Sequence, residues 1–129
     1  MGRRIAKRSS VVLVRYPFTD LSGAKVRPAI IITPDEFLKR MDDVICLFIS
    51  SAVPESNKRL PTDFVLETTH PSFSKTGLKY CSVLRCHKLA LLSKRLVERV
   101  MGEIDQPLMT EVDRCLRLAL GLSVTRNDT

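Results

Sequence analysis

The chain has 129 residues, of which 44% are hydrophobic and 27% are charged. This length fits one compact domain and hardly two, and the composition excludes a chain that is disordered throughout. Its 21 Lys and Arg outnumber its 14 Asp and Glu, giving a formal net charge of +7. A basic surface favours a polyanion such as a nucleic acid, because each cation placed on a phosphate releases counterions. The alternative is that a basic N-terminal arm, residues 1–10, inflates the sum.

The cysteines are expected to be reduced. Their spacing matches neither a metal-binding CxxC pair nor the framework of a disulfide-rich secreted domain. The apolar stretch near the N-terminus is interrupted by Arg15, so no signal peptide is predicted, and no apolar run reaches the length of a membrane span. We therefore expect a cytoplasmic protein that does not bind membranes.

The first half of the chain predicts short strands separated by loops. Residues 11–14 form a β-branched run that is typical of a buried strand, and residues 26–32 form a second. Pro28 lies inside the second run and has no N–H to donate, which predicts an edge or a bulge there. Residues 33–36 predict a helix start, with Thr33 as the cap and a capping box, and the helix ends near Met41.

The second half predicts further strands and one clear helix. Residues 44–49 form a strand covered on both faces, and residues 62–67 alternate as a half-exposed strand does. Extended structure with one break is expected over 78–92, and another strand over 97–104. A final helix is capped by Asp105, keeps apolar residues at i, i+4, i+7 and i+8, and ends at Gly121. This order predicts a mainly β fold with added helices: a small barrel over 11–122, followed by a polar tail, 123–129.

Several segments resemble, in order, the PemK/MazF toxins of type II toxin–antitoxin systems. Residues 11–23, followed by the Arg27-Pro28 step and an aliphatic run, resemble the start of these toxins. Residues 44–51 resemble their third strand, which ends in Thr or Ser. Residues 61–64, 77–83, 102–104 and 112–122 fit the remaining strands and the closing helix. The likeness runs from Val11 to Leu122 and is greatest to the Kid/PemK branch.

The resemblance implies an SH3-like β-barrel with added short helices and a C-terminal helix, assembled as a homodimer. It also implies cleavage of single-stranded RNA, often messenger RNA, without a metal ion or other cofactor. The implied protein partner is a cognate antitoxin whose extended tail fills the RNA groove. Gyrase-poisoning toxins have a similar fold, so the fold alone does not decide the chemistry.

Arg27 matches the Arg of the family's Arg-Pro step and is the first candidate catalytic residue. In metal-free RNA cleavage, negative charge builds on the phosphoryl oxygens and on the leaving 5′-oxygen. A guanidinium can hold two of those oxygens and keeps its charge at any relevant pH. The structural alternative is an ion pair at the barrel rim, for example with Asp20.

Ser50 stands at the position of the family's catalytic Thr or Ser, where a hydroxyl would orient the phosphate. The alternative is a serine that bonds backbone where a strand ends. Its neighbour Ser51 leaves the choice open by one residue, because adjacent strand residues face opposite sides.

Residues 85–87, Arg-Cys-His, resemble an Arg-Cys-Asp segment of the Kid/PemK branch. Arg85 is retained, and His87 replaces the Asp of the proposed acid–base set. A His can accept the proton of the 2′-hydroxyl, so His87 is a candidate general base. The alternatives are a different acid–base scheme, lost activity, or a histidine at the barrel rim.

Basic residues in the flanking loops are candidates for phosphate contacts: Lys25, Lys58, Arg59 and Lys79. Each is as well explained by an ordinary solvated surface. Tyr16 and Phe18 are the only aromatic residues expected near the groove, so little base stacking is predicted.

The function predicted overall is a metal-independent endoribonuclease that leaves 2′,3′-cyclic phosphate and 5′-hydroxyl ends. The alternatives are a non-cleaving nucleic-acid or gyrase binder and a degenerate toxin that regulates a partner.

Overall fold

The computed structural model describes residues 6–16 and 25–122 of the chain. In this part of the chain, six strands form one sheet in the order β4-β5-β3-β2-β1-β6, and every neighbouring pair is antiparallel. The strands are β1 Ser10–Tyr16, β2 Lys25–Ile31, β3 Asp43–Ser50, β4 Asp63–Leu66, β5 Ser82–Ser93 and β6 Val97–Glu103.

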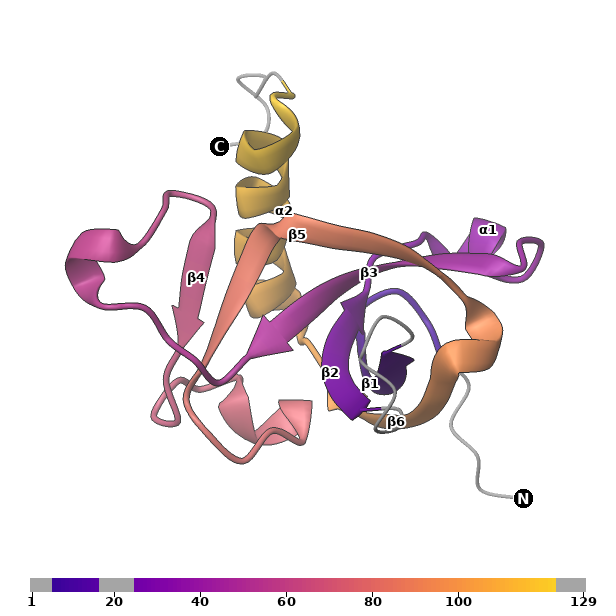
Figure 1. Ribbon diagram of the computed structural model, residues 1–129, viewed down its shortest axis with the longest axis horizontal. Helices are drawn as coiled ribbons and strands as arrows, with labels where there is room; N and C mark the ends of the chain where they lie inside the picture. The colour runs from indigo at the N-terminus through magenta and orange to yellow at the C-terminus, as the bar shows by residue number, and fades with distance from the viewer. Residues whose placement is uncertain (1–5, 17–24, 123–129) are drawn as a thin grey trace.

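In the described residues, the sheet is accompanied by two α-helices and three short 3-10 helices: α1 Asp35–Leu38, α2 Gln106–Leu120, η1 Ser56–Lys58, η2 Phe73–Thr76 and η3 Lys94–Leu96. Figure 1 shows α2 standing beside the bend of β5, whereas α1 lies near the opposite end of the molecule. None of the helices in the described ranges is long and apolar enough to cross a membrane.

The predicted mainly β fold with helices is confirmed, but a closed barrel is not. Within the described residues no ladder joins the outer strands β4 and β6. The predicted strands 26–32, 44–49 and 97–104 agree with β2, β3 and β6 to within one residue at each end. Extended structure was expected from residue 78, whereas β5 begins at Ser82.

The predicted capping box at the first helix is wrong. Pro34 occupies the N-cap of α1, with no side-chain cap, and the helix ends at Leu38. The Thr33 hydroxyl instead accepts the Ile45 N–H at 2.8 Å, which ties the loop to β3. The local pattern predicted that the Thr33 hydroxyl would cap the helix, but it is hydrogen-bonded to a strand instead.

The prediction for α2 is confirmed at both ends. The Asp105 carboxylate accepts the Leu108 N–H at 3.3 Å, and Gly121 follows the helix in the left-handed conformation with φ 68°. The apolar stripe of the helix, which includes Val112, Cys115 and Leu116, packs against the sheet.

The central strands bury side chains on both faces, which gives two cores. One core contains Val11, Ile30 and Leu47 with the apolar stripe of α2. The other contains their neighbours Val12 and Ala29 on the opposite face, with Leu38 of α1 and further residues. Alternation along each strand sends successive residues to opposite cores, so β1, β2 and β3 read as continuous apolar runs.

Two irregularities interrupt the strand pairing near the candidate site. β2 is an interior strand, but its pairing with β3 begins only at Ala29, so Pro28 lies at a local edge. In β5 the register jumps: Leu89 faces Leu47 and Leu84 faces Ile49, so residues 85–88 stand opposite Phe48 alone. A bulge of this kind bends a strand and redirects its side chains. The jump falls on the predicted residues Arg85 and His87.

Candidate functional site

Two open cavities meet at Arg27 and Ser50. We call the first the Tyr80 cavity, of about 670 Å³, and the second the Arg85 cavity, of about 620 Å³. Both are lined by Arg27, Ile49, Ser50 and Ala52. The structure therefore brings Arg27 and Ser50, two residues singled out from the sequence, to one junction.

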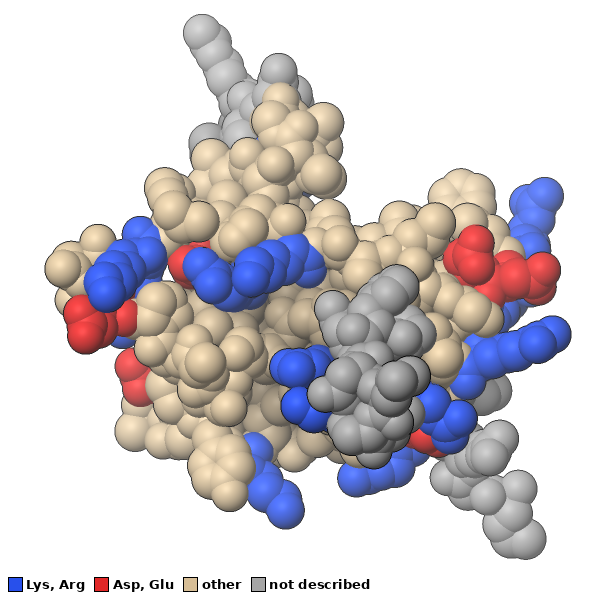
Figure 2. Space-filling model, in the orientation of Figure 1, with Lys and Arg blue, Asp and Glu red and all other residues tan. Residues whose placement is uncertain are grey.

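Arg27 lies on the part of β2 that extends beyond its ladder with β3. It pairs with Val14 of β1, and its side chain is exposed. Asp20, the acidic partner considered for it from the sequence, lies outside the described residues. Figure 2 shows Lys and Arg side chains across the middle of one face, with most acidic side chains toward its two sides.

Ser50 is the last residue of β3 and lies opposite Val83 of β5. Its hydroxyl oxygen accepts the Ala52 N–H at 3.1 Å, which is the strand-end backbone bond considered from the sequence. Because the oxygen is the acceptor in this bond, the hydroxyl proton can still be donated to a phosphate. Ser51 is exposed and lines only the Tyr80 cavity. The structure thus places Ser50, rather than Ser51, between the two cavities.

Arg85 lines the Arg85 cavity and is paired with a buried acid. Its Nε donates to the Asp63 carboxylate at 3.0 Å, and the Asp63 side chain has 0% exposure. Burial by itself would raise the pKa of Asp63. The Leu60 N–H bond and the adjacent Arg85 outweigh it, and the pKa lies below its usual range. Asp63 is therefore ionised at neutral pH and holds the guanidinium in place.

His87 lies two residues further along β5 and lines neither cavity. Its Nδ1 lies 2.8 Å from the Thr62 hydroxyl oxygen and 4.0 Å from the Asp63 carboxylate. Residues 62 and 63, at the start of β4, thus contact both members of the predicted acid–base set. The Thr62 hydroxyl can donate to Nδ1 or accept from it, so the contact allows either tautomer of the ring.

The predicted phosphate-binding residues fall into two groups. Lys25 and Lys79 line the Tyr80 cavity together with Arg27. Lys58 and Arg59 lie at η1 and line neither cavity, and the Arg59 Nε donates to the Pro54 carbonyl at 3.0 Å. The structure does not bring this second pair to the junction.

Sequence reasoning missed three residues here: Asp63, Lys88 and Tyr80. Lys88 lines the Arg85 cavity, and Tyr80 lines the cavity named after it. The expectation that Tyr16 and Phe18 are the only aromatic residues near the groove is therefore wrong. Phe18 and the Tyr16 side chain lie outside what the structure describes. Tyr80 follows Lys79 in a loop, and that neighbouring positive charge was the available signal.

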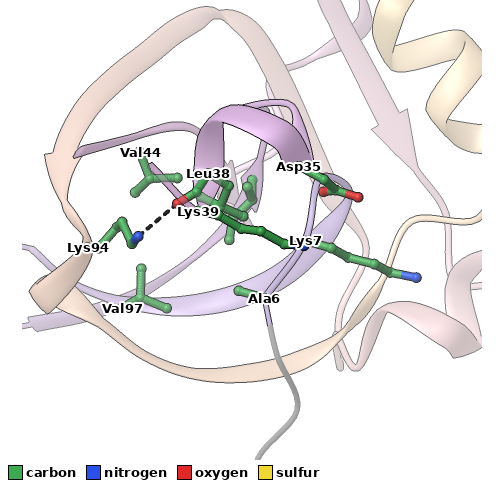
Figure 3. A pocket seen from close by; sticks show the side chains of 9 residues that line it. Ala6, Lys7, Asp35, Leu38, Lys39, Val44, Lys94 and Val97 are labelled. Carbon is green, nitrogen blue, oxygen red and sulfur yellow. Dashed lines mark hydrogen bonds between the residues drawn. The ribbon is translucent and has the colours of Figure 1, made fainter. Parts of the chain in front are cut away.

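Another cavity, of about 440 Å³, lies at the α1 end and contains none of the predicted site residues. Figure 3 shows Leu38, Val44 and Val97 in its wall and the bond of 2.7 Å from Lys94 Nζ to the Leu38 carbonyl. The apolar part of its lining belongs to the core that contains Val12, Ala29 and Leu38. It is separate from the junction of Arg27 and Ser50.

Several solved structures share this fold. A structure described as an endoribonuclease in complex with its cognate antitoxin, from mycobacterial species, has a TM-score of 0.73 at 16% identity and covers 94% of this chain and 100% of its own. The Mycobacterium tuberculosis toxin MazF-mt6 has a TM-score of 0.70 at 16% identity, covering 89% and 99%. A MazE–MazF structure from Deinococcus radiodurans has a TM-score of 0.69 at 19% identity, covering 93% and 100%. At these identities the likeness shows the fold.

No curated protein matches the chain. The model of the family described as PemK-like, MazF-like toxin of type II toxin–antitoxin system matches residues 7–120. This match does not single out the Kid/PemK branch, which stays a prediction. It spans nearly all of the described fold and both candidate cavities. The chain therefore belongs to the PemK-like, MazF-like toxins of type II toxin–antitoxin systems.

Proposed function

We propose that the protein is an endoribonuclease toxin that cuts single-stranded RNA by metal-independent transesterification. The observation that carries the proposal is the junction of two open cavities at Arg27 and Ser50. Three cations, Lys25, Arg27 and Lys79, line one cavity, and Arg85 and Lys88 line the other. A phosphodiester at the junction would lie between these charges.

The proposed reaction is an attack of the ribose 2′-oxygen on the adjacent phosphorus. The new P–O2′ bond forms as the P–O5′ bond breaks, and a base takes the 2′-hydroxyl proton while an acid protonates the leaving 5′-oxygen. The products carry a 2′,3′-cyclic phosphate and a 5′-hydroxyl. Arg27 stabilises the charge that builds on the phosphoryl oxygens, and the Ser50 hydroxyl orients the same phosphate.

Arg85 and His87 are the proposed acid–base residues. Arg85 is held by Asp63, the first residue of β4, and His87 by Thr62, which precedes that strand. With a proton on Nδ1, the Nε2 of His87 would be able to accept the 2′-hydroxyl proton, and Arg85 would compensate the charge of the phosphorane. His87 lies beyond the lining of the Arg85 cavity, so this role requires the ribose to extend along β5 past Arg85.

The partners proposed are a second copy of this chain and a cognate antitoxin. Support for the antitoxin comes from the mycobacterial structure of similar fold, which is an endoribonuclease in complex with its cognate antitoxin, and the second copy rests on the family resemblance. An antitoxin segment laid over Arg27 would exclude RNA from the junction. We expect added antitoxin to inhibit cleavage in proportion to its occupancy of the toxin.

The proposal is tested with purified protein and a short single-stranded RNA in excess EDTA. We expect cleavage, with cyclic phosphate and 5′-hydroxyl ends found by end-group analysis. Arg27→Ala should lower the cleavage rate by about a hundredfold or more, as loss of an electrostatic transition-state contact does. Arg40→Ala, which removes an exposed Arg next to α1, is the matched control and should cleave normally.

Three results would each count against a part of this proposal. Intact RNA together with growth arrest traced to gyrase would favour the binding alternative. Full cleavage by Arg27→Ala would remove Arg27 from the mechanism, even if the chain proves to be a nuclease. A requirement for added metal would exclude the metal-independent step.

A further inference from the structure

Tyr80 is presented to solvent from the wall of the Tyr80 cavity. It is 69% exposed, the highest value among the large hydrophobic side chains of the described chain that are exposed. The other side chains lining this cavity include Lys25, Arg27 and Lys79. A large ring left in water beside three cations is the feature to be explained.

The loop that carries Tyr80 is fixed by its backbone. Gly77 has φ 78°, and a Cβ on it would lie 2.5 Å from the Met101 carbonyl, so the loop packs directly on β6. The Thr76 hydroxyl donates to the Phe73 carbonyl at 2.6 Å and accepts the Leu78 N–H at 3.1 Å. The Ser82 hydroxyl donates to the Tyr80 carbonyl at 2.8 Å. The ring is thus offered from a preorganised backbone, which reduces the ordering entropy that binding has to overcome.

The chemistry of the cavity wall selects the kind of ligand. Besides apolar side chains such as Leu78 and Met101, its described lining contains three cations and the hydroxyls of three serines, and it contains no Asp or Glu. A peptide docked there, such as an antitoxin segment, would have to bring acidic side chains to these cations. A single-stranded nucleic acid supplies phosphates for the cations and flat bases for the ring, which is the pairing of features that such sites use.

We propose that Tyr80 is a stacking platform for one nucleobase of the RNA, next to the phosphate held by Arg27. This inference rests on the proposed endoribonuclease function and adds a base-binding subsite to it. Every base has a π-face, so the stack supplies affinity and alignment, whereas it discriminates weakly between bases. The subsite places one nucleotide in the Tyr80 cavity while the scissile phosphate lies at the junction.

The first test measures binding of a 2′-O-methyl RNA oligonucleotide, which lacks the attacking hydroxyl and stays intact. Tyr80→Leu keeps the apolar bulk but removes the π-face, and its Kd should rise about tenfold, the size of one lost base–aromatic stack. Tyr80→Phe should bind within about twofold of wild type. Phe37→Leu, an exposed aromatic on α1, is the matched control and should leave the Kd unchanged.

Tyrosine emission gives a direct readout, because the chain contains no Trp and its only tyrosines are Tyr16 and Tyr80. We expect the oligonucleotide to quench this emission in wild type, and Tyr80→Phe to lose most of the quenching while keeping its affinity. Emission that is quenched equally in Tyr80→Phe would show that the ring does not meet a base.

Single abasic sites moved along the oligonucleotide locate the stacked base. In wild type one position should show a loss of affinity of about tenfold, and in Tyr80→Leu that loss should disappear, because the two changes remove the same contact. If wild type cuts RNA but no abasic penalty depends on Tyr80, the stacking subsite is wrong and the nuclease function stands. If wild type neither binds nor cuts RNA, both are wrong.

Unchanged RNA affinity in Tyr80→Leu together with weaker self-association, measured by analytical ultracentrifugation, would also overturn the subsite. That outcome would assign Tyr80 to a contact between copies of the chain.

Discussion

The Asp63 carboxylate, fully shielded from solvent, accepts a hydrogen bond from Arg85 Nε at 3.0 Å. The same carboxylate lies 4.0 Å from Nδ1 of His87. A single acid on β4 therefore sets the surroundings of both β5 residues that are candidates for proton transfer. The family's pattern has an Asp at position 87, where this chain has a His. In this chain an acid, Asp63, stands on the neighbouring strand instead.

Asp63→Asn should weaken both the fold and the site. It leaves an acceptor for the Leu60 N–H but removes the charge that pairs with Arg85, which is about a quarter exposed. Because water can still reach the guanidinium, we expect a loss of about 1 to 3 kcal/mol in unfolding free energy, less than for a fully buried pair. Urea unfolding measures it. If Arg85→Gln and Asp63→Asn prove additive, the pair is not energetically coupled.

The acid dependence of stability should also change in Asp63→Asn. The pKa of Asp63 lies below its usual range in the folded protein, so the unfolded chain takes up this proton first as the pH falls. The stabilisation is complete above the ordinary aspartate pKa of about 3.9 and is lost as the pH drops through the lower folded value. The pKa of Asp105 is also lowered, chiefly by the Ser72 hydroxyl, so Asp105 adds an acid dependence of the same direction. Wild type and Asp63→Asn both contain Asp105, so its contribution cancels in the comparison.

We therefore expect the urea midpoints of wild type and Asp63→Asn to converge as the pH is lowered from 7 toward 3. A gap between the two midpoints that stays constant over this range would mean that Asp63 is not responsible.

Restoring the family's acid at position 87 should be harmful in this chain. His87→Asp would set a second carboxylate beside Asp63, and mutual repulsion should destabilise the fold by about 1 kcal/mol and disfavour two ionised acids. Adding Asp63→Asn should recover most of that loss, because only one charge remains. Thermal unfolding of the two single variants and the double variant measures the coupling; equal stability of His87→Asp and wild type would contradict it.

The contact between η2 and β6 predicts an unequal pair of glycine variants. A Cβ on Gly102 would lie 2.3 Å from the Lys75 carbonyl oxygen, and backbone cannot move aside as a flexible side chain can. We expect Gly102→Ala to lose about 3 kcal/mol or more in unfolding free energy. Gly121→Ala meets no atom within 4 Å and carries only the strain of its left-handed φ, about 1 kcal/mol. Similar urea midpoints for the two variants would contradict this packing.

The cysteines should differ in reactivity. Burial raises the pKa of Cys46 to about 11 and, with the nearby Cys115, that of Cys86 to about 12. At pH 8 a thiol with a pKa of 11 is thiolate in roughly one molecule in a thousand. Cys81 is partly exposed, so it should react with iodoacetamide first although its pKa is also raised. Peptide mapping of the folded and the urea-unfolded protein tests this order, and early labelling of Cys46 would refute it.

Much of the fold follows from local sequence. The β-branched runs predicted the strands because both of their faces are buried, and the apolar spacing from Leu108 to Ala119 predicted α2 with both of its ends. The prediction failed at Thr33, where a tertiary bond to Ile45 replaced a local cap. Local patterns contain no information about a competing partner twelve residues away.

The site was predictable only in part, for the same reason. Resemblance supplied Arg27 and Ser50, and the structure brings them to one junction. The pairing of Arg85 with Asp63 depends on the register between β4 and β5, in which the two residues face each other, and no local pattern reveals that register. Lys58 and Arg59 carry the right charge, but η1 holds them outside both cavities.

The order of the strands has a consequence for synthesis on the ribosome. Every candidate site residue precedes residue 89 in the chain. However, β6 can pair with β1 and pack on η2, and α2 can cover its core, only after residues 97–122 have been made. A nascent chain that stops before β6 has all of its site side chains but lacks the contacts that hold them. We therefore expect a growing polypeptide to be harmless to the messenger that encodes it until its last quarter has emerged and folded.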